Sequence, residues 1–255
     1  MKDRIDRIME ILARKGYQSV NELAAELNVS DMTVRRYLDR LEEKEMIKRT
    51  HGGAFAGQEM IEVDYRIRET VHSEEKEAIG QRAFSMIQPG ESVFIDAGTT
   101  PAFLAYAIND TKRITVVTNS LVVAGALENR PNVQCILLGG TVHGATHSVV
   151  GQMAEEGLGQ FRFNRAFMGT SAIDLSAGLS QSTFEEIPLK RKAARQATKV
   201  VVLADSSKFD KQVTFLFMQL TEVHVIITDA GISGSDAQAL RDKGIEVILA
   251  PPEPT

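Results

Sequence analysis

One stretch of the sequence decides how the first part of the chain folds: Ser30-Asp31-Met32-Thr33-Val34-Arg35-Arg36-Tyr37-Leu38-Asp39-Arg40-Leu41. Val34, Leu38 and Leu41 recur at helical spacing, which predicts a helix with one buried face. Ser30 suits the N-cap, because its hydroxyl can accept a hydrogen bond from a backbone N–H of the first turn. The side chains outside the apolar stripe are candidates for contacts in a DNA major groove: Met32, Thr33, Arg35, Arg36 and Arg40.

The residues before this helix favour DNA binding over the alternative, an ordinary surface helix with solvated arginines. Apolar residues at helical spacing over 2–15 predict a first helix, which Gly16 can end. Ser19 and Glu22 have the spacing of a capping box, which predicts the start of a short second helix. A turn of about three residues then leads into Ser30, as in a helix-turn-helix.

The residues after the helix have the composition of a wing. Gly52 and Gly53 separate two short extended stretches, as in a β-hairpin, although a plain linker turn would also use two glycines. In a wing, three side chains would meet phosphates or an adjacent minor groove: Lys48, Arg49 and His51. We therefore expect a winged helix-turn-helix domain over 1–56.

Charge and composition limit the classes of function. The chain has 255 residues and a net charge of −5, but its first 56 residues carry 11 Lys and Arg against 10 Asp and Glu. The larger remainder is acidic, so DNA binding must be local to the first segment. Cys135 is the one cysteine, which excludes a disulfide within the chain. With no apolar run long enough for a bilayer and no signal-like N-terminus, we expect a cytoplasmic protein without a membrane partner.

The rest of the chain alternates between apolar, β-rich runs and helical patterns. Seven runs predict strands: 92–95, 114–117, 133–138, 165–168, 199–203, 222–227 and 245–249. Five patterns predict helices, the fourth delayed or kinked by Pro188: 74–87, 101–108, 121–128, 183–197 and 235–243. Such alternation predicts an α/β domain with a mainly parallel sheet and helices on both faces. We expect this domain over 74–250, a linker over 57–73 and a disordered tail over 251–255.

Small polar residues collect at the C-terminal ends of these strands, where ligands bind in sheets of this kind. They are Asp96, Gly98, Thr99, Thr100, Thr118, Asn119, Ser120, Gly139 and Gly140, with later groups at 169–171 and 205–209. Any one end could be an ordinary helix cap. Five such ends in one sheet, with Lys208 as a counter-charge, indicate a site for a small anionic, polyhydroxylated ligand. Because no Walker motif or full dinucleotide fingerprint is present, we expect no cofactor.

The histidines do not form a convincing metal motif. His143 and His147 are four residues apart, but the glycines around them argue against a helix that would bring them onto one face. No cysteine or carboxylate stands at metal-ligand spacing from them, and His143 could instead line the ligand site. No Ser/His/Asp or Cys/His arrangement is visible, so we expect neither a metal site nor catalytic residues.

Residues 4–55 resemble the N-terminal domain of DeoR-type bacterial transcriptional regulators. The matching segments are Arg7–Leu12, Glu22–Ala24, Val29–Arg36 and Arg49–Ala54. The chain departs from the family at Tyr37, where an acidic residue is usual. Tyr37 could pack against the core or send its hydroxyl to a phosphate, so the family's operator sequences do not transfer directly.

Residues 74–250 resemble the effector domain of the same regulators, which is similar to ribose-5-phosphate isomerase. The matching segments are Asp96–Thr100, Thr118–Ser120, Gly139–Gly140 and Asp205–Phe209. The resemblance implies a sugar-phosphate site with Gly98, Thr99 and Thr100 near the phosphate, Asp96 and Asn119 on hydroxyls, and Lys208 paired with an anionic group. It also implies roles for Glu185 and Lys190, which fall where the isomerases carry catalytic groups.

Together these features predict a repressor of a carbohydrate-utilisation operon whose affinity for operator DNA is changed by a phosphorylated sugar. One helix-turn-helix makes few contacts, so we expect a homo-oligomer, a dimer or a tetramer. Two alternatives stay open. The first is a sugar-phosphate isomerase that would use Asp174, Glu185, Lys190 and Lys208. The second is a regulator that responds to an unphosphorylated polyol or acid.

Overall fold

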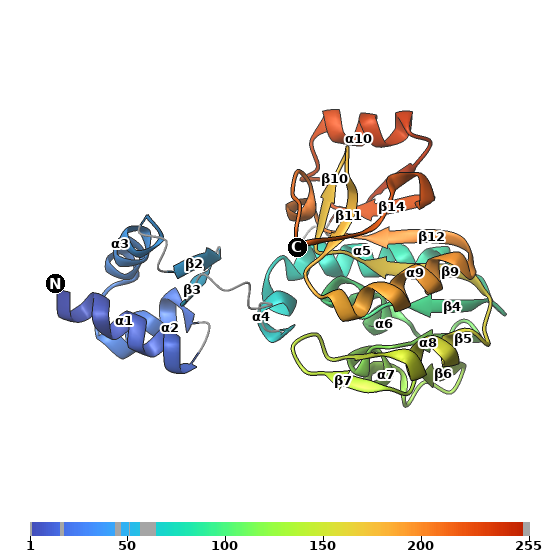
Figure 1. Ribbon diagram of the computed structural model, residues 1–255, viewed down its shortest axis with the longest axis horizontal. Helices are drawn as coiled ribbons and strands as arrows, with labels where there is room; N and C mark the ends of the chain where they lie inside the picture. Colours follow the sequence, from blue (N-terminus) through green and yellow to red (C-terminus); the bar gives the residue numbers. More distant parts are fainter. Residues whose placement is uncertain (1, 16–17, 44–46, 51, 57–64, 252–255) are drawn as a thin grey trace. The chain divides into compact units, whose positions relative to one another are not determined.

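The structure, a computed structural model, describes residues 2–15, 18–43, 47–50, 52–56 and 65–251. The chain divides into two compact units, Met1–Ile61 and Glu62–Thr255 (Figure 1). Each unit has its own apolar core, and the larger unit has two core clusters, one on each side of its central sheet. No helix in the described ranges is long and apolar enough to span a membrane.

The smaller unit is a winged helix-turn-helix. Its elements are α1 (Lys2–Lys15), β1 (Gln18–Ser19), α2 (Val20–Leu27), α3 (Asp31–Glu42), β2 (Ile47–Thr50) and β3 (Gly53–Ala56). The strands form an antiparallel sheet in the order β1-β3-β2. The three helices and the hairpin confirm the prediction. Strand β1 was not predicted, because two residues are too few to show a periodic pattern.

Both predicted helix starts exist, but only one is capped by its serine side chain. At α2 the N–H of Glu22 donates to Ser19 Oγ (3.2 Å), and the N–H of Ser19 donates to Glu22 Oε2 (2.7 Å), which completes the capping box. At α3 we expected the Ser30 hydroxyl to accept a hydrogen bond from a backbone N–H of the first turn, and the described contacts contain no such bond. The N–H of Thr33 donates to the Ser30 carbonyl instead, and the Ser30 hydroxyl contacts Thr33 Oγ1 (3.0 Å).

The larger unit is built on a parallel sheet whose seven described strands run in the order β15-β14-β12-β9-β4-β5-β6. They are β4 (Ser92–Ile95), β5 (Ile114–Thr118), β6 (Val133–Leu137), β9 (Phe163–Gly169), β12 (Ala197–Leu203), β14 (Val225–Thr228) and β15 (Glu246–Leu249). Every one of them overlaps an apolar run that predicted a strand. The mainly parallel α/β fold is therefore confirmed.

Helices cover both faces of the sheet, as predicted. Helices α5 (Ser73–Met86), α6 (Thr99–Ala107) and α7 (Leu121–Leu127) pack on one face. Helices α8 (Gln152–Leu158), α9 (Ile187–Arg195) and α10 (Gly234–Asp242) pack on the other. Pro188 lies in the first turn of α9, after a 3-10 turn, η1 (Phe184–Glu186), so it does delay the helix.

Several small elements were not predicted. They are helix α4 (Tyr65–Thr70), the hairpin of β7 (Thr141–His143) and β8 (Ser148–Val150), the 3-10 turns η2 (Ser206–Lys208) and η3 (Leu220–Glu222), and a second sheet of β10 (Ala172–Asp174), β11 (Gly178–Gln181) and β13 (Phe215–Met218). Helix α8 was also missed. All are short or rich in glycine and serine, so they lack the repeated apolar pattern on which the prediction depended.

The predicted linker, 57–73, does not correspond to one kind of structure. Residues 57–64 lie outside the described ranges, as do 252–255 of the predicted tail. Helix α4 occupies 65–70, and its Tyr65 is buried. Because α5 begins at Ser73, the second half of the expected linker belongs to the larger unit.

Candidate functional site

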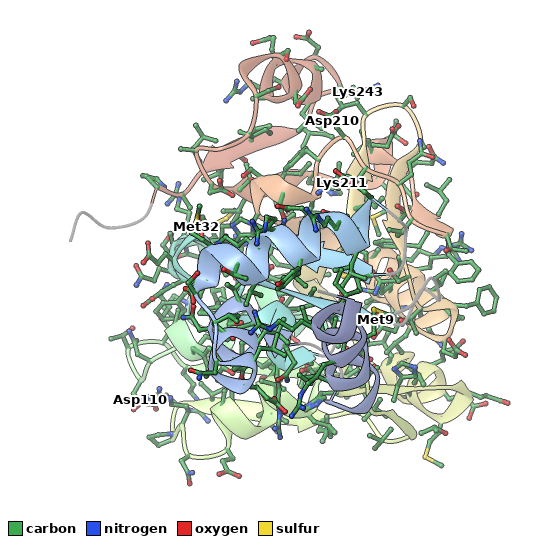
Figure 2. All side chains as sticks on the ribbon, turned by 90° about the vertical axis from the view of Figure 1, so that its left-hand side faces the viewer. Met9, Met32, Asp110, Asp210, Lys211 and Lys243 are labelled. Carbon is green, nitrogen blue, oxygen red and sulfur yellow. The ribbon has the colours of Figure 1, made fainter. Side chains whose placement is uncertain are left out.

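The side of α3 that was predicted to read DNA lies opposite the buried apolar stripe. The apolar stripe is buried, and Met32 on the other side is 78% exposed (Figure 2). Arg35 and Arg36 are exposed, whereas Thr33 and Arg40 are half-buried. This arrangement presents two guanidinium groups and a thioether from a helix whose back is fixed by packing, as major-groove reading requires.

Tyr37 takes the packing alternative. Its side chain is buried in the core of the smaller unit together with Val34 and Leu38. The Arg36 guanidinium lies 5.9 Å from the centre of its ring, close enough for a cation–π contact. Tyr37 therefore supports the helix and orients Arg36.

The wing is described only in part. Arg49 on β2 forms an ion pair with Asp39 on α3, so a phosphate would have to compete with that carboxylate for the guanidinium. The backbone of Lys48 lies in β2, but its side chain is outside the described part, and so is all of His51. Their predicted phosphate contacts stay predictions.

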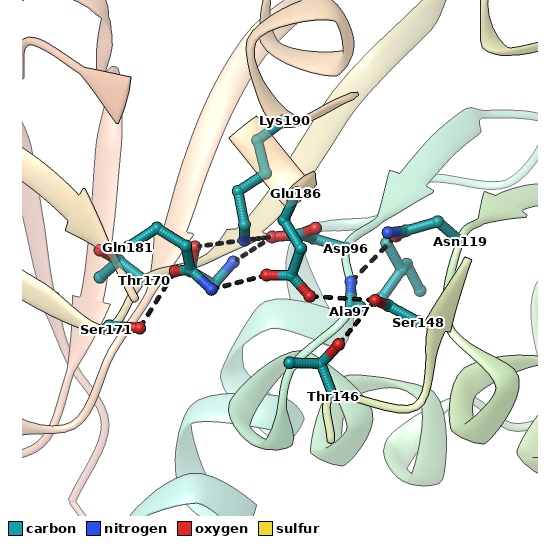
Figure 3. A network of polar contacts seen from close by, with 12 residues as sticks. Asp96, Ala97, Asn119, Thr146, Ser148, Thr170, Ser171, Gln181, Glu186 and Lys190 are labelled. Atoms are coloured by element: carbon teal, nitrogen blue, oxygen red, sulfur yellow. Dashed lines mark hydrogen bonds and ion pairs between the residues drawn. The ribbon is translucent and has the colours of Figure 1, made fainter. Parts of the chain in front are cut away.

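In the larger unit, Asp96 directly follows β4 and forms a buried ion pair with Lys190 of α9 (Figure 3). Their side chains are 1% and 2% exposed. Asp96 Oδ2 also accepts from the N–H of Gly169 (3.0 Å), and Lys190 Nζ also donates to the Gly169 carbonyl (3.1 Å). Burial raises the pKa of Asp96, the Lys190 ammonium opposes that shift, and Glu186 adds to it. Asp96 Oδ1 is buried and has no hydrogen-bond partner among the described residues.

Glu186, and not the predicted Glu185, enters this polar network. Glu185 is exposed, whereas Glu186 accepts from Ser148 Oγ at Oε1 (3.0 Å) and from Gln181 Nε2 at Oε2 (2.6 Å) (Figure 3). The two glutamates lie in a 3-10 turn ahead of a proline, which turns Glu186 inward and Glu185 outward. A role of Glu185 in binding the effector stays a prediction.

The predicted polar loops are present, but several of their side chains hold the structure together. Thr118 Oγ1 donates to the Ile95 carbonyl (2.6 Å), and Ser120 Oγ caps α7. Asn119 Oδ1 accepts from the N–H of Ala97 (3.1 Å). These three residues therefore shape the edge of the sheet through bonds that the protein already makes, which is the capping alternative.

Glycine is needed for different reasons at Gly98 and at Gly140. Gly98, with φ of 147°, precedes α6, where Thr99 and Thr100 form the buried first turn. The backbone there takes a conformation that favours glycine, as the predicted phosphate loop needs. Gly140, with φ of 152°, has no room for a Cβ, which would lie 2.6 Å from the Val150 carbonyl oxygen. Gly140 is therefore required by the β7–β8 hairpin, and Gly139 precedes it in the same connection.

A second group of charges surrounds Lys208, the predicted counter-charge. Lys76 of α5 is 3% exposed, and burial lowers its pKa to about 8. The Asp205 carboxylate opposes that shift, and the cations Lys208 and Arg68 add to it. Burial also lowers the pKa of Lys208, again opposed by Asp205. Asp205 Oδ2 is buried and, like Asp96 Oδ1, lacks a partner among the residues described.

Lys76 is the clearest functional candidate that the sequence analysis missed. A signal was present, because Lys76, Ile79 and Ala83 stand at helical spacing on the buried side of α5. A lysine in an apolar stripe is costly to bury unless it serves a purpose or has a partner. The stripe was taken as a packing pattern only, and the charged member at its start was overlooked.

No hydrogen bond or ion pair among the described residues joins Asp174, Glu185, Lys190 and Lys208, the residues proposed for an isomerase reaction. Asp174 Oδ1 accepts from the N–H groups of Ser176 (2.8 Å) and Ala177 (2.7 Å) within the β10–β11 turn. Glu185 faces solvent, and Lys190 is committed to Asp96. Among the described residues, no three or more His, Cys, Asp or Glu side chains cluster as metal ligands.

The sequence matches two known domain families. Residues 4–59 match the DeoR-like helix-turn-helix domain, and residues 71–230 match the DeoR C terminal sensor domain. The chain is 31% identical to the glycerol-3-phosphate regulon repressor of Escherichia coli over 96% of its own length and 98% of that protein. It is 31% identical to the transcriptional regulator IolR of Bacillus subtilis over 97% of its own length and 98% of that protein.

Among solved structures, ribose 5-phosphate isomerase A from Methanocaldococcus jannaschii is similar at 13% sequence identity with a TM-score of 0.41. That likeness covers 54% of this chain and 55% of the isomerase. The full-length relatives named above are both transcriptional regulators by name.

Proposed function

Because the chain belongs to the DeoR family of transcriptional regulators, we propose that it represses a carbohydrate-utilisation operon in response to a phosphorylated sugar. The DNA-binding residues would be those on the exposed side of α3, with Arg36 and Arg35 as base readers and the wing on phosphates. The effector would bind at the C-terminal edge of the central sheet and change the affinity for operator DNA.

The observation that carries this proposal is the buried Lys76 together with the half-buried Lys208, both of which interact electrostatically with Asp205. Burying like charges in one place is unfavourable, and an anionic ligand would remove that cost. Phosphate suits such a site because each ammonium group can donate charge-assisted hydrogen bonds to its oxygens.

The sugar part of the ligand would be recognised by acceptors. Asp96 Oδ1 and Asp205 Oδ2 are buried without described partners, and hydroxyl groups are the donors that would satisfy them. The first turn of α6, with Thr99 and Thr100 after Gly98, would add backbone N–H groups for the phosphate.

A thermal-shift screen of the full-length protein against sugar phosphates and their unphosphorylated parents tests the proposal. A ligand at about 100 times its dissociation constant adds roughly 2.7 kcal/mol of stability. We expect shifts from phosphates only, lost in Lys208→Met and kept in the control Lys243→Met, which removes an exposed lysine after α10. A shift from a parent polyol or acid alone would favour the unphosphorylated effector.

The proposal also includes self-association. Because one recognition helix contacts few base pairs, specific repression requires at least two copies on neighbouring half-sites. We expect a dimer or a tetramer by light scattering, and an operator whose half-sites are spaced by whole turns of DNA. A monomer that binds one half-site with full affinity would contradict this part.

A further inference from the structure

Helix α4 is held against the larger unit by contacts at both of its ends. At its start, the ring of Tyr65 stacks on the ring of His147 with 5.0 Å between the ring centres. Near its end, the Tyr106 hydroxyl of α6 donates to Glu69 Oε1 (2.9 Å). The helix has six residues, and a helix this short is not stable by itself in water. Its stability therefore depends on such contacts.

The strongest of these contacts comes from Lys76. Its ammonium group donates to the carbonyls of Arg68 and of Val71 (2.5 Å), which lie in the last turn of α4 and just beyond it. Carbonyls at the end of a helix lack partners within the helix and carry partial negative charge. Lys76 thus caps α4 with a buried, charge-assisted bond.

Lys76 is also part of the cation group that would bind the effector. An ammonium group has three donors, and two of them are spent on α4. A phosphate oxygen carries formal charge and is a stronger acceptor than a carbonyl. One donor of Lys76 is left, so an anion that accepts more than one bond from Lys76 would compete with α4 for the same ammonium group.

We infer that α4 is a latch that the effector releases. An anionic group bound by Lys76 and Lys208 draws the ammonium group away from the carbonyls of Arg68 and Val71, and α4 loses stability. The inference rests on the proposed effector site. Helix α4 is the first described element after the DNA-binding unit in the chain. The latch is a two-state element that ligand and operator binding can both bias.

Amide hydrogen exchange of the full-length protein tests the latch, with inorganic phosphate as the probe and chloride at matched ionic strength as the reference. In wild type, phosphate slows exchange at residues 98–102 and speeds exchange at 66–72 about tenfold, because a charged hydrogen bond of this kind contributes a factor of that order. In Lys76→Met without phosphate, exchange at 66–72 is already fast, and phosphate adds nothing there.

Tyr106→Phe is the matched variant, because it removes a different side-chain bond to α4 and leaves Lys76 in place. It should speed exchange in α4 modestly while the response to phosphate persists. The half-exposed position of Tyr106 on α6 makes this variant safe for folding.

The possible failures are distinguishable. Protection at 98–102 without faster exchange at 66–72 would overturn the latch and leave the proposed effector site standing. No response to phosphate anywhere, with fast exchange in Lys76→Met, would leave Lys76 as a structural cap and overturn release by an anion. Unchanged exchange at 66–72 in Lys76→Met would show that Lys76 does not hold α4 at all.

Discussion

The recognition helix α3 and the C-terminal edge of the central sheet place their charges in opposite ways. On α3, Arg35 and Arg36 are exposed over a core that is complete without them. At the sheet edge Asp96, Lys190 and Lys76 are buried and are part of the packing. A surface site can therefore be altered at little cost to the fold, whereas the buried site couples ligand, charge and stability.

The largest expected effect is on the buried side of this comparison. Lys190→Met leaves the Asp96 carboxylate buried without its cation, so we expect the free energy of unfolding to fall by about 3–5 kcal/mol. Urea unfolding of the full-length protein measures it. The double variant Asp96→Asn, Lys190→Met should regain part of the loss. A loss below about 1 kcal/mol would show that the pair is no more costly to break than a surface pair.

The exposed side should respond in affinity and not in stability. Arg36→Ala should weaken operator binding by about 1–3 kcal/mol and relax specificity at one base pair, because one base-reading side chain is lost. Fluorescence anisotropy with labelled operator DNA measures this, and Arg241→Ala on α10 is the control in the larger unit. Unchanged affinity in Arg36→Ala would mean that another side of α3 faces the DNA.

The two sites should also differ in their response to pH. Burial holds the pKa of Lys76 at about 8, so its charged fraction, and with it the affinity for sulfate, should fall about tenfold from pH 7 to pH 9. The unfolded chain, with its ordinary lysine pKa, binds more protons above pH 8, so the same rise in pH stabilises the folded state. Calorimetric titration with sulfate, whose charge is constant here, measures the affinity.

The control for this experiment is the affinity for operator DNA, measured without effector over the same pH range. Arginine side chains stay charged over the whole range, so contacts from Arg35 and Arg36 should change little. A sulfate affinity that stays constant between pH 7 and pH 9 would mean that Lys76 does not bind the anion.

The smallest expected effect is the difference in stability loss between substitutions of Ser19 and of Ser30, the two serines that precede helices in the smaller unit. Ser19→Ala removes a capping box and should destabilise that unit by about 1 kcal/mol. Ser30→Ala should cost less, since the Ser30 hydroxyl makes no described bond to a backbone N–H. Hydrogen exchange of α1 to α3 measures both in the intact chain. Equal losses would show that Ser30 caps α3 in solution.

The sequence was sufficient to predict the elements that have a repeated apolar pattern. Seven apolar runs became the seven strands of the sheet, and the stripe of Val34, Leu38 and Leu41 became the buried side of α3. Such patterns are local, because buried positions recur at a regular spacing within a single helix or strand. The DNA-reading side of α3 could be assigned because it is the complement of that stripe.

The sequence was insufficient where geometry joins distant segments. Lys76 comes from α5, whereas Asp205 and Lys208 come from the connection after β12, and no spacing in the chain relates Lys76 to the other two. Glu185 was named from the family resemblance, whereas the contacts of the structure bring Glu186 into the buried polar network. Thr118 and Asn119 looked like ligand groups, yet their bonds go to the backbone of β4 and Ala97. The sequence pattern predicted polar residues at the strand ends, but tertiary contacts decide which of their side chains are already used within the protein.

Operator affinity measured with and without effector tests the central claim most directly. The operator would be selected from random DNA by the full-length protein, and the effector would be the sugar phosphate that stabilises it in the thermal screen. The account predicts that the effector changes wild-type affinity at least tenfold, and that the ratio of the two affinities falls to about one in Lys208→Met while Lys243→Met keeps it. An unchanged ratio in Lys208→Met would contradict the claim that the buried lysines sense the ligand.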